Sequence, residues 1–392
     1  MNKLLKNTII IFIFFKITII IASFLYEHLP LQLIHFEHLA TEDIQFNDIY
    51  YSSRVNDIDQ NKDIIVINSG SIVNNENFRS ELGRLLNLIG NYKPKKIGID
   101  LLFDKQKEKD SILQKSIFDN DVILAMDSKN NHENIFKSNT YGIINFPIKE
   151  NETVREYYNY TIKDSIKYNS FASVLSGIIK EDSIYYLKYN TDSKGYYDAL
   201  NNSNKIIINN FPAIEASAIL NKIDTLEVKN LIENKIVIIG HLGSGNMDNV
   251  YDIEDKFKVP NNSSLYNRVQ TMPGAVIHAN ALQMLLNDYK IKKVEGWLYE
   301  IITSIILYIF LLLFYSIHHK YKLSKLINML IILLSTIPII LLSCVYLMDL
   351  NVYYKVGALF MQIVFLEEFI DISDGFKKLF IKNKWIWKRI SF

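Results

Sequence analysis

The chain has 392 residues, and its 43 basic and 42 acidic side chains leave a formal net charge of +1. This balance provides no basic surface of the kind that nucleic acid requires, so we expect no nucleic-acid partner. The sequence holds one cysteine, Cys344, within an apolar stretch. No disulfide is therefore expected, and the polar part of the chain must be held by its own hydrophobic core.

Four apolar stretches set the predicted organisation of the chain. Each is about 18 residues or longer, which is enough for a helix to cross the hydrocarbon core of a bilayer. They cover residues 8–25, 297–317, 326–348 and, more weakly, 352–370. We predict a membrane anchor over residues 1–26, an exported domain over 27–295, three transmembrane helices over 296–370 and a short basic tail over 371–392.

Basic residues beside these stretches predict the orientation of the chain in the membrane. Lys3 and Lys6 precede the first stretch, the segment HHKYKLSK joins the second to the third, and six bases follow the fourth. Positively charged loops stay in the cytoplasm, so both termini are expected inside the cell and residues 27–295 outside it. We predict a multi-pass protein of the inner (plasma) membrane, whose basic aromatic tail contacts membrane lipids.

The first apolar stretch leaves two alternatives open. Lys16 lies near its middle, where it either pairs with Glu300 or Glu367 or extends back to the inner headgroups. A cleaved signal peptide is the rival to a permanent anchor. The apolar run is long and no small-residue cleavage site stands out, which favours an uncleaved anchor.

The exported domain alternates short apolar runs with stretches of helical period, which predicts parallel strands buried on both faces. The part from about 140 to 200 is rich in tyrosine, and its alternating runs predict an antiparallel section. We therefore predict a mixed α/β domain with a largely parallel sheet core plus an antiparallel section, beside an all-helical membrane part. Strands are predicted over 63–68, 95–100, 121–127 and 235–241, and helices over 78–92, 110–118 and 272–287.

Six short motifs follow one another along this domain. They are EDIQFNDIYYSSR, IVINSGS, KKIGIDLLFD, YGIINFPIKENETVR, NKIVIIGHLGSGNMD and MPGAVIHANALQMLL. Together they resemble the CHASE2 domains of bacterial receptors over about residues 40–290, and the PG-x-x-x-HAN core of the last motif is the most specific. The arrangement of one apolar stretch before the domain and three after it is also that of the family.

The resemblance implies an extracytoplasmic sensory module, and it implies a homodimer. Receptors of this family normally continue into a histidine kinase, nucleotide cyclase or protein kinase, whereas this sequence stops after its tail, so we expect a separate signalling partner protein. Two departures stand out. Asn68 occupies a position where the family usually has Asp, and VNNENFR lacks an aromatic-proline stretch before Arg79.

Polar side chains follow three of the predicted strands. Ligands of open α/β sheets bind outside the carboxyl ends of the strands, so we expect a site for an unidentified small molecule or ion at this edge. The alternative is that these side chains cap the following helices and turns. The candidates are Asn68, Ser71, Asp100, Asp104, His241 and Asp248, with Ser69 and Ser244 beside them.

His278 and the segment GHLGSG have simpler interpretations. On a helix, His278 shares a face with Ala275 and Leu282, which favours a core histidine with hydrogen-bonded ring nitrogens over a ligand. GHLGSG follows a strand but lacks the Gly-Lys-Ser/Thr ending of a P-loop, which favours a tight turn. The sequence contains no Gly-x-Ser-x-Gly, no His-Glu-x-x-His and no exported cysteine, so we predict no enzyme activity, no metal and no cofactor.

The predicted function is a sensor that detects an extracytoplasmic signal and relays it across the membrane to a partner. Two alternatives from other classes stay open. One is a structural or assembly subunit that docks an envelope protein and binds no ligand. The other is an accessory subunit of a transporter, in which Lys16, Glu300, Lys355 and Glu367 form a polar relay.

Overall fold

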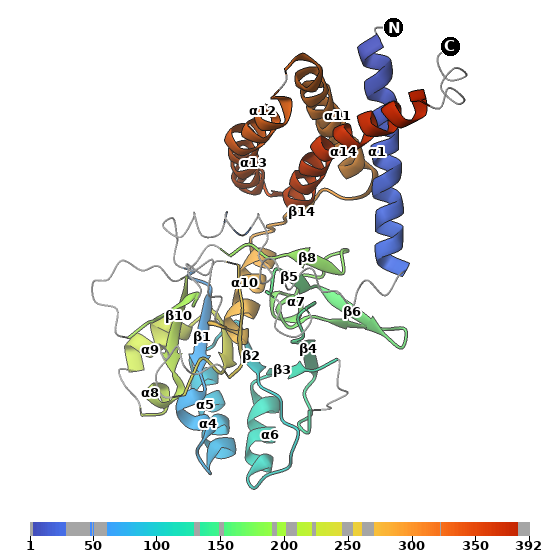
Figure 1. Ribbon diagram of the computed structural model, residues 1–392. Helices are drawn as coiled ribbons and strands as arrows, with labels where there is room; N and C mark the ends of the chain where they lie inside the picture. The colour runs from blue at the N-terminus through green and yellow to red at the C-terminus, as the bar shows by residue number, and fades with distance from the viewer. Residues whose placement is uncertain are drawn as a thin grey trace. The chain divides into compact units, whose positions relative to one another are not determined.

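The computed structural model describes residues 3–28, 48, 50, 61–128, 134–148, 153–189, 194–200, 210–221, 225–244, 254–260, 270–321 and 323–382. The chain forms two compact units, which we treat separately. The helical unit comprises Met1–Ile49 with Lys292–Phe392, and the α/β unit comprises Tyr50–Ile291. The domain boundaries at residues 26, 295 and 370 stay predictions. Figure 1 shows the elements of both units with the labels used below.

The core of the α/β unit is a seven-stranded sheet in which every strand runs parallel to its neighbours (Figure 1). The strand order is β4-β3-β2-β11-β1-β10-β9. The strands are β1 Ile64–Asn68, β2 Lys96–Asp100, β3 Ile123–Met126, β4 Thr140–Ile143, β9 Tyr196–Asp198, β10 Phe211–Glu215 and β11 Ile236–Gly240. Every residue of β1 and β11 is buried, which explains why both strands are continuous apolar runs. The prediction of a mixed α/β domain with a parallel core is confirmed.

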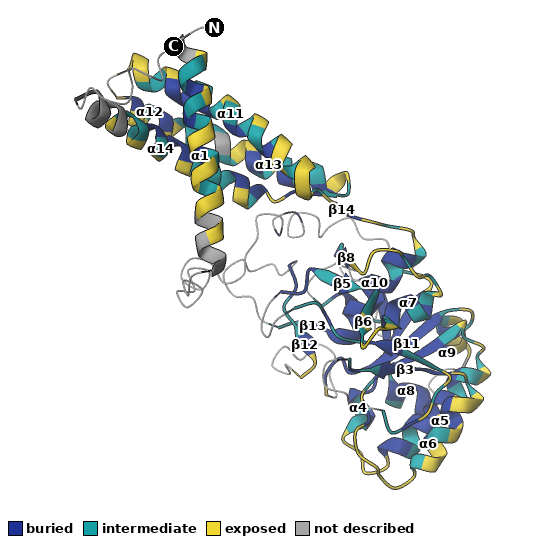
Figure 2. Cartoon of the chain, turned by 90° about the vertical axis from the view of Figure 1, so that its right-hand side faces the viewer, coloured by how far each residue is buried: buried dark blue, intermediate teal, exposed yellow. Residues whose placement is uncertain are grey.

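Helices cover both faces of this sheet, and Figure 2 shows its strands buried between them. One core is formed by alternate strand residues such as Ile65 and Ile67 with apolar side chains of five helices. The other face carries two helices that pack against each other. The first group is α4 Gly70–Val73, α5 Phe78–Asn91, α6 Asp110–Asp119, α8 Ala216–Leu220 and α9 Thr225–Ile232, and the second is α7 Phe171–Ser176 and α10 Gly274–Leu286.

The predicted antiparallel section is present but shorter than expected. Two antiparallel pairs occur, β5 with β8 and β6 with β7. The ends of the 140–200 segment were predicted wrongly, because β4 and β9 are parallel strands at the two edges of the main sheet. An edge strand is covered incompletely and can alternate in the way that an antiparallel strand does. The short strands are β5 Glu156–Tyr158, β6 Tyr160–Lys163, β7 Ile166–Asn169, β8 Ile184–Tyr186, β12 Lys256–Phe257 and β13 Met272–Pro273.

The helical unit consists of long helices around a shared apolar core, to which α1, α11, α13 and α14 contribute. The π-helix η2 joins α12 to α13 and ends two residues before Pro338. Proline has no backbone N–H to donate, which accounts for a relaxed turn at this position. The elements are α1 Lys3–His28, α11 Gly296–Lys320, α12 Ser324–Ile331, η2 Ile332–Thr336, α13 Ile337–Asp349 and α14 Val356–Lys382, with β14 Lys292–Lys293 paired to β15 Val352–Tyr353.

Two helices among the described residues are long and apolar enough to cross a membrane. They are Gly296–Lys320 and Ser324–Asp349. The first predicted stretch lies within α1, whereas the last one begins with β15 and then enters α14, which continues to Lys382. The arrangement of one span before the α/β unit and three after it therefore stays a prediction.

Candidate functional site

The last residues of four neighbouring strands form a row at the carboxyl edge of the sheet. Asp100 of β2 lies opposite Gly240 of β11, which lies opposite Asn68 of β1, which in turn lies opposite Glu215 of β10. We call these four residues the strand-end row. The sequence prediction required β1, β2 and β11 to be neighbours, and the strand order meets that condition. Because Ile67 and Ile99 face α5 and its neighbours, the row points toward α7 and α10.

Asn68 is fully buried, and its amide uses its whole hydrogen-bonding capacity. Its Nδ2 donates to Oε1 of Glu215 at 2.8 Å and to the carbonyl of Gly243 at 3.1 Å. Its Oδ1 accepts from the backbone N–H groups of Gly70 and Leu242 at 2.9 and 2.8 Å. Asn68 thus ties β1 to β10 and to the loop after β11, which is a structural role.

Two glycines permit the close packing around this amide. A Cβ atom on Gly240 would lie 2.5 Å from Cβ of Ala275 in α10, and one on Gly70 would lie 1.7 Å from the carbonyl oxygen of Gly243. Gly243 itself has φ +140°. The described part of GHLGSG therefore wraps around Asn68 as a turn, which agrees with the tight-turn interpretation.

Asp100 is the row's buried acid. Its exposed fraction is 5%, and its Oδ2 has no hydrogen-bond partner among the described residues. Its Oδ1 lies 3.7 Å from Nε2 of His278, which is longer than a hydrogen bond. Burial raises the pKa of Asp100 to about 7. This carboxyl therefore changes its charge near neutral pH, which a solvated aspartate does not do.

His278 is a core residue, as predicted, with an exposed fraction of 1%. Its ring stacks on Phe146 with centroids 5.0 Å apart, and Phe171 lies edge-on at 5.4 Å. Burial lowers the pKa of His278 to about 3, so the ring is neutral at physiological pH. Its helix places it beside Asp100, which the sequence did not predict.

The contact with the Tyr157 hydroxyl indicates which ring nitrogen of His278 carries the hydrogen. Tyr157 is buried, its oxygen accepts from the N–H of Ala172 at 3.3 Å, and it lies 2.6 Å from Nδ1 of His278. Because this oxygen already accepts from Ala172, we assign the phenol as the donor to Nδ1, which places the hydrogen of the neutral imidazole on Nε2, facing Asp100. Burial also raises the pKa of Tyr157, so the phenol stays protonated.

Two acids, one in the row and one near it, were missed by the sequence analysis. Glu215 ends β10, whose run FPAIE was not predicted as a strand, although it ends in an acid as KKIGID does. Asp255 is a loop residue that no motif marked, and its carbonyl accepts from the N–H of Gly274, the first residue of α10. Although Asp255 keeps an exposed surface, desolvation by the surrounding protein atoms and then the charges of Asp100 and Glu254 raise its pKa.

The remaining residues predicted for the site are not members of the strand-end row. Ser71 lies in α4, where its hydroxyl accepts from the N–H of Ser217 at 3.2 Å and is also hydrogen-bonded to the carboxylate of Glu215 in the row. His241 is buried directly after β11, and its Nε2 lies 3.9 Å from Oε2 of Glu254. Asp104 is exposed and its charge acts on Arg79, away from Asp100. Asp248 lies outside the described residues, and ligand binding by the six predicted residues stays a prediction.

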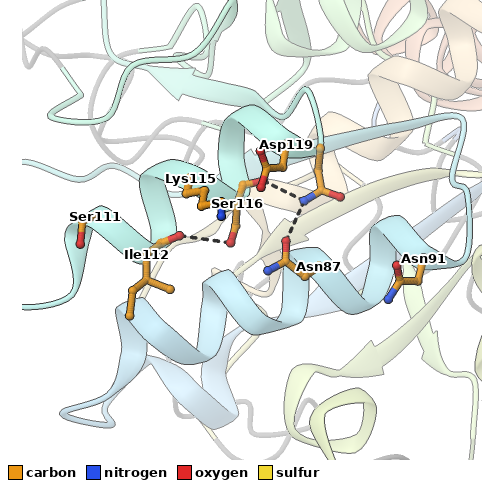
Figure 3. A pocket seen from close by; sticks show the side chains of 8 residues that line it. Asn87, Asn91, Ser111, Ile112, Lys115, Ser116 and Asp119 are labelled. Atoms are coloured by element: carbon orange, nitrogen blue, oxygen red, sulfur yellow. Dashed lines mark hydrogen bonds between the residues drawn. The ribbon is translucent and has the colours of Figure 1, made fainter.

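An open groove lies between α5 and α6, on the opposite face of the sheet from α10 (Figure 3). Its volume is about 610 Å³, and no residue predicted for the site lines it. The amide of Asn120 crosses part of this groove and donates to Oδ1 of Asn87 at 3.1 Å. The groove is lined by Asn87, Asn91, Ser111, Ile112, Lys115, Ser116, Asp119 and Asn120.

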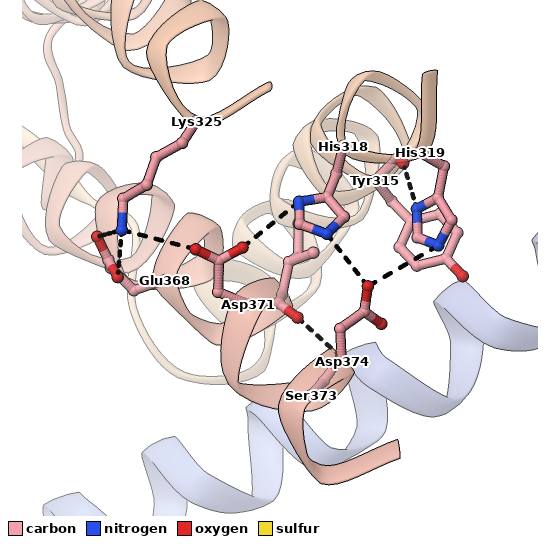
Figure 4. A network of polar contacts seen from close by, with 9 residues as sticks. Tyr315, His318, His319, Lys325, Glu368, Asp371, Ser373 and Asp374 are labelled. Carbon is pink, nitrogen blue, oxygen red and sulfur yellow. Dashed lines mark hydrogen bonds and ion pairs between the residues drawn. The ribbon is translucent and has the colours of Figure 1, made fainter. Parts of the chain in front are cut away.

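A polar network in the helical unit joins α11, α12 and α14 (Figure 4). His318 lies between two carboxylates, with Nδ1 3.4 Å from Asp371 and Nε2 3.1 Å from Asp374. Lys325 lies 3.1 Å from Glu368 and 3.6 Å from Asp371. Among the described residues, no three His, Cys, Asp or Glu side chains are arranged to hold a metal ion.

A second charged contact joins α1 to α11. Nζ of Lys16 lies 3.1 Å from Oε2 of Glu300, so the structure favours the pairing interpretation of Lys16 and selects Glu300 as the partner. The other acid proposed for Lys16, Glu367, is buried and hydrogen-bonded to Asn328 of α12. The four residues of the predicted polar relay are thus divided between separate contacts.

Comparisons with known proteins bear on the family. The model of the CHASE2 domain matches residues 18–317, which is most of the chain. No curated protein and no solved structure matches it. CHASE2 domains are extracytoplasmic sensory domains, and the match includes the α/β unit together with α11. The chain belongs to the CHASE2 domain family.

Proposed function

We propose that the chain is a membrane-bound receptor that detects an extracytoplasmic signal through its α/β unit and relays it to a separate signalling protein. The observation that carries this proposal is the CHASE2 match over residues 18–317. The proposed protein is a non-catalytic receptor and acts as a homodimer. In this proposal its output passes through the separate partner protein.

The packing of α10 supports a route for the signal. Ala275 of α10 contacts Gly240 of the strand-end row, and His278 lies one turn further along, beside Asp100. In the sequence, α10 is the last helix before α11, and residues 287–295 are all that separate them. A change at the row that displaces α10 would therefore reach the first residues of α11.

The proposed membrane arrangement has four crossings, by α1, α11, the helix from Ser324 to Asp349, and α14. The basic residues of the sequence support cytoplasmic termini and an exported α/β unit at the inner membrane. In this orientation the network around His318 lies at the cytoplasmic ends of α11 and α14. It would transmit a movement of α11 to the basic tail that follows α14, next to the lipid headgroups.

One observation favours a second function. The pair between Lys16 and Glu300 joins two helices that the proposal places in the membrane, and charges at membrane depth are often part of a transport pathway. An accessory subunit of a transporter is therefore the alternative. A structural subunit that only docks an envelope protein has one argument in its favour, because Asn68 and Asp100 are closed off from solvent.

The test is purification of the full chain from its native membrane after crosslinking, followed by mass spectrometry. Gly240→Ala should displace α10 and change the yield of the partner, whereas Asp104→Asn, at an exposed position, serves as the matched control. Recovery of a kinase, cyclase or response regulator that depends on Gly240 supports the receptor. Recovery of transport or envelope proteins alone, at the same yield from both variants, would overturn it.

A further inference from the structure

We propose that the ligand of the strand-end row is the proton, and that Asp100 binds it and reports its binding through α10. This inference deepens the receptor function proposed above and rests on it. It concerns the chemical class of the signal, which the family does not specify.

The first argument is that Asp100 is enclosed. Asp100 and its neighbours Asn68 and His278 have exposed fractions of 5%, 0% and 1%. Beside Asp100, Gly240 packs so closely against Ala275 of α10 that a Cβ atom on it would lie 2.5 Å from Cβ of Ala275. A small molecule needs a cavity of several hundred cubic ångströms, whereas a proton reaches a buried carboxyl through small fluctuations of the fold.

The second argument is the incomplete bonding of Asp100. Its Oδ2 lacks a hydrogen-bond partner, and no lysine or arginine in the described part of the chain lies within ion-pair distance of it. A buried carboxylate without a cation or hydrogen-bond donors is strongly unfavourable, so the protonated form is the one that this packing accommodates. Proton loss then requires the surroundings to change.

Titratable groups from several elements lie around Asp100. His278 of α10 and Tyr157 of β5 are both neutral, and they remain so because burial lowers the pKa of the first and raises that of the second. Asp255 and Glu254, which precede β12, are acids, and the charge of Asp100 raises the pKa of Asp255. These neighbours therefore oppose the ionisation of Asp100 or do not compensate for it.

Two further titratable groups, His241 and Glu215, belong to the other side of the row. His241 follows β11 and faces Glu254, and Glu215 of β10 accepts a hydrogen bond from Asn68. Burial raises the pKa of Glu215, and its hydrogen bonds with Asn68 and Ser71 oppose this rise. An experiment on Asp100 must therefore separate its titration from those of Asp255 and Glu215.

Ionisation has a defined structural consequence. The Nε2–H of His278 faces Oδ1 of Asp100 at 3.7 Å, and a charged carboxylate would draw this donor to about 2.8 Å. The first turn of α10, at the end of the helix whose dipole also favours an anion, would move with it. Because Ala275 already touches Gly240, α10 has to tilt or rotate rather than approach the sheet.

Two measurements on the full chain in lipid nanodiscs test the proposal. The first is infrared difference spectroscopy from pH 4 to pH 9 with labelled aspartate, which follows the protonated carboxyl directly. The second is the emission of Trp297 at the start of α11, after Trp385→Phe and Trp387→Phe leave it as the sole tryptophan. Wild type is compared with Asp100→Asn and Asp255→Asn, and Asp104→Asn is the matched control.

The expected result is a buried aspartic acid that titrates near pH 7, is absent in Asp100→Asn and is unchanged in Asp104→Asn. Asp255→Asn should lower its midpoint by removing a like charge, and Trp297 emission should follow the same midpoint. Absence of any aspartic acid that titrates near pH 7 in wild type, or such a transition that persists in Asp100→Asn, would overturn the proposal. Where Asp100→Asn fails to fold, the spectrum of Asp255→Asn decides, because it keeps Asp100 and lacks the other aspartate with a raised pKa.

The experiment also separates this inference from the receptor function. Titration of Asp100 near pH 7 that leaves Trp297 emission unchanged means that the proton binds but is not relayed, which overturns this inference and leaves the receptor function to be decided by partner recovery. Partner recovery that depends on Gly240 but not on pH means that the receptor functions with another signal. This result contradicts the proposal that the proton is the ligand.

Discussion

Nε2 of His278 lies 3.7 Å from Oδ1 of Asp100, and both side chains are almost completely buried. The distance is too long for a hydrogen bond but short enough for the two ionisable groups to interact electrostatically. Because His278 also accepts a hydrogen bond from Tyr157, the contact links the carboxyl end of β2, helix α10 and the antiparallel section. Three parts of the α/β unit thus depend on one protonation state.

The pH dependence of stability follows from the two shifted pKa values. Asp100 has its pKa raised from 3.8 to about 7, so the native state binds the proton more tightly than the unfolded state. Its contribution is fully present below about pH 4 and is lost as pH rises to about 7. His278 has its pKa lowered from 6.5 to about 3, so its contribution is lost in the opposite direction, as pH falls through this range.

These opposing contributions make Asp100→Asn informative. The stability of the variant should no longer fall as the pH rises to neutrality, but it should still fall as the pH becomes acidic. The free energy of unfolding of the variant relative to wild type should therefore rise between pH 5 and pH 8, by up to ~3 kcal/mol. Denaturant unfolding at both pH values measures this difference. An unchanged difference, with Asp104→Asn behaving as wild type, would show that Asp100 is not buried as described.

The Asn68→Asp substitution places an acid at a fully buried position, and we expect it to destabilise this chain. The new carboxylate cannot donate to Oε1 of Glu215 at 2.8 Å or to the carbonyl of Gly243. Two acceptors then face each other in a buried site. The expected loss is about 2–4 kcal/mol in the free energy of unfolding, measured by denaturant titration.

A second substitution distinguishes this cause from a general loss of packing. Glu215→Gln supplies an amide that can donate to the carboxylate introduced by Asn68→Asp, so the double variant should recover part of the loss. A double-mutant cycle gives the coupling directly. If Glu215→Gln fails to improve the stability of Asn68→Asp at any pH, the contact between the two residues is not what makes Asn68 necessary.

The sequence predicted the parallel core because β1, β2, β3 and β11 are apolar on both faces and therefore appear as uninterrupted runs. It missed β10, because Pro212 removes a donor and argues against an inner strand. Asn68, Asp100 and His241 were placed at one edge because a strand's last residue is known once the strand is known. Asp104 was predicted at the same edge, but it follows its strand by four residues and lies exposed in a loop.

The neighbours of His278 could not be predicted from the sequence. Helical periodicity predicted correctly that this residue lies on an apolar face, but periodicity cannot reveal which side chain from another element faces it. That information depends on how α10 crosses β2 and β11, and it is set by the contact of Ala275 with Gly240. The hydroxyl of Tyr157 comes from a segment that is 121 residues away in the chain.

The pair between Lys16 and Glu300 gives a prediction for the helical unit. Lys16→Glu places two acids about 3 Å apart between α1 and α11 and should lower the melting temperature of the full chain in detergent. The exposed fraction of Glu300 is 63%, which limits the effect in detergent to about 1 kcal/mol. Glu300→Lys alone should also lower the melting temperature, because it places two bases opposite each other.

Gly240 and Ala275 allow the packing of α10 to be tested by complementation. Gly240→Ala places a methyl group 2.5 Å from Cβ of Ala275, so α10 must move away and the free energy of unfolding should fall by about 1–3 kcal/mol. Ala275→Gly costs about 1 kcal/mol alone, because glycine is a weak helix former. In the Gly240→Ala background the same change removes the clash and should restore stability. Additive losses in the double variant would show that the contact between β11 and α10 does not position the helix.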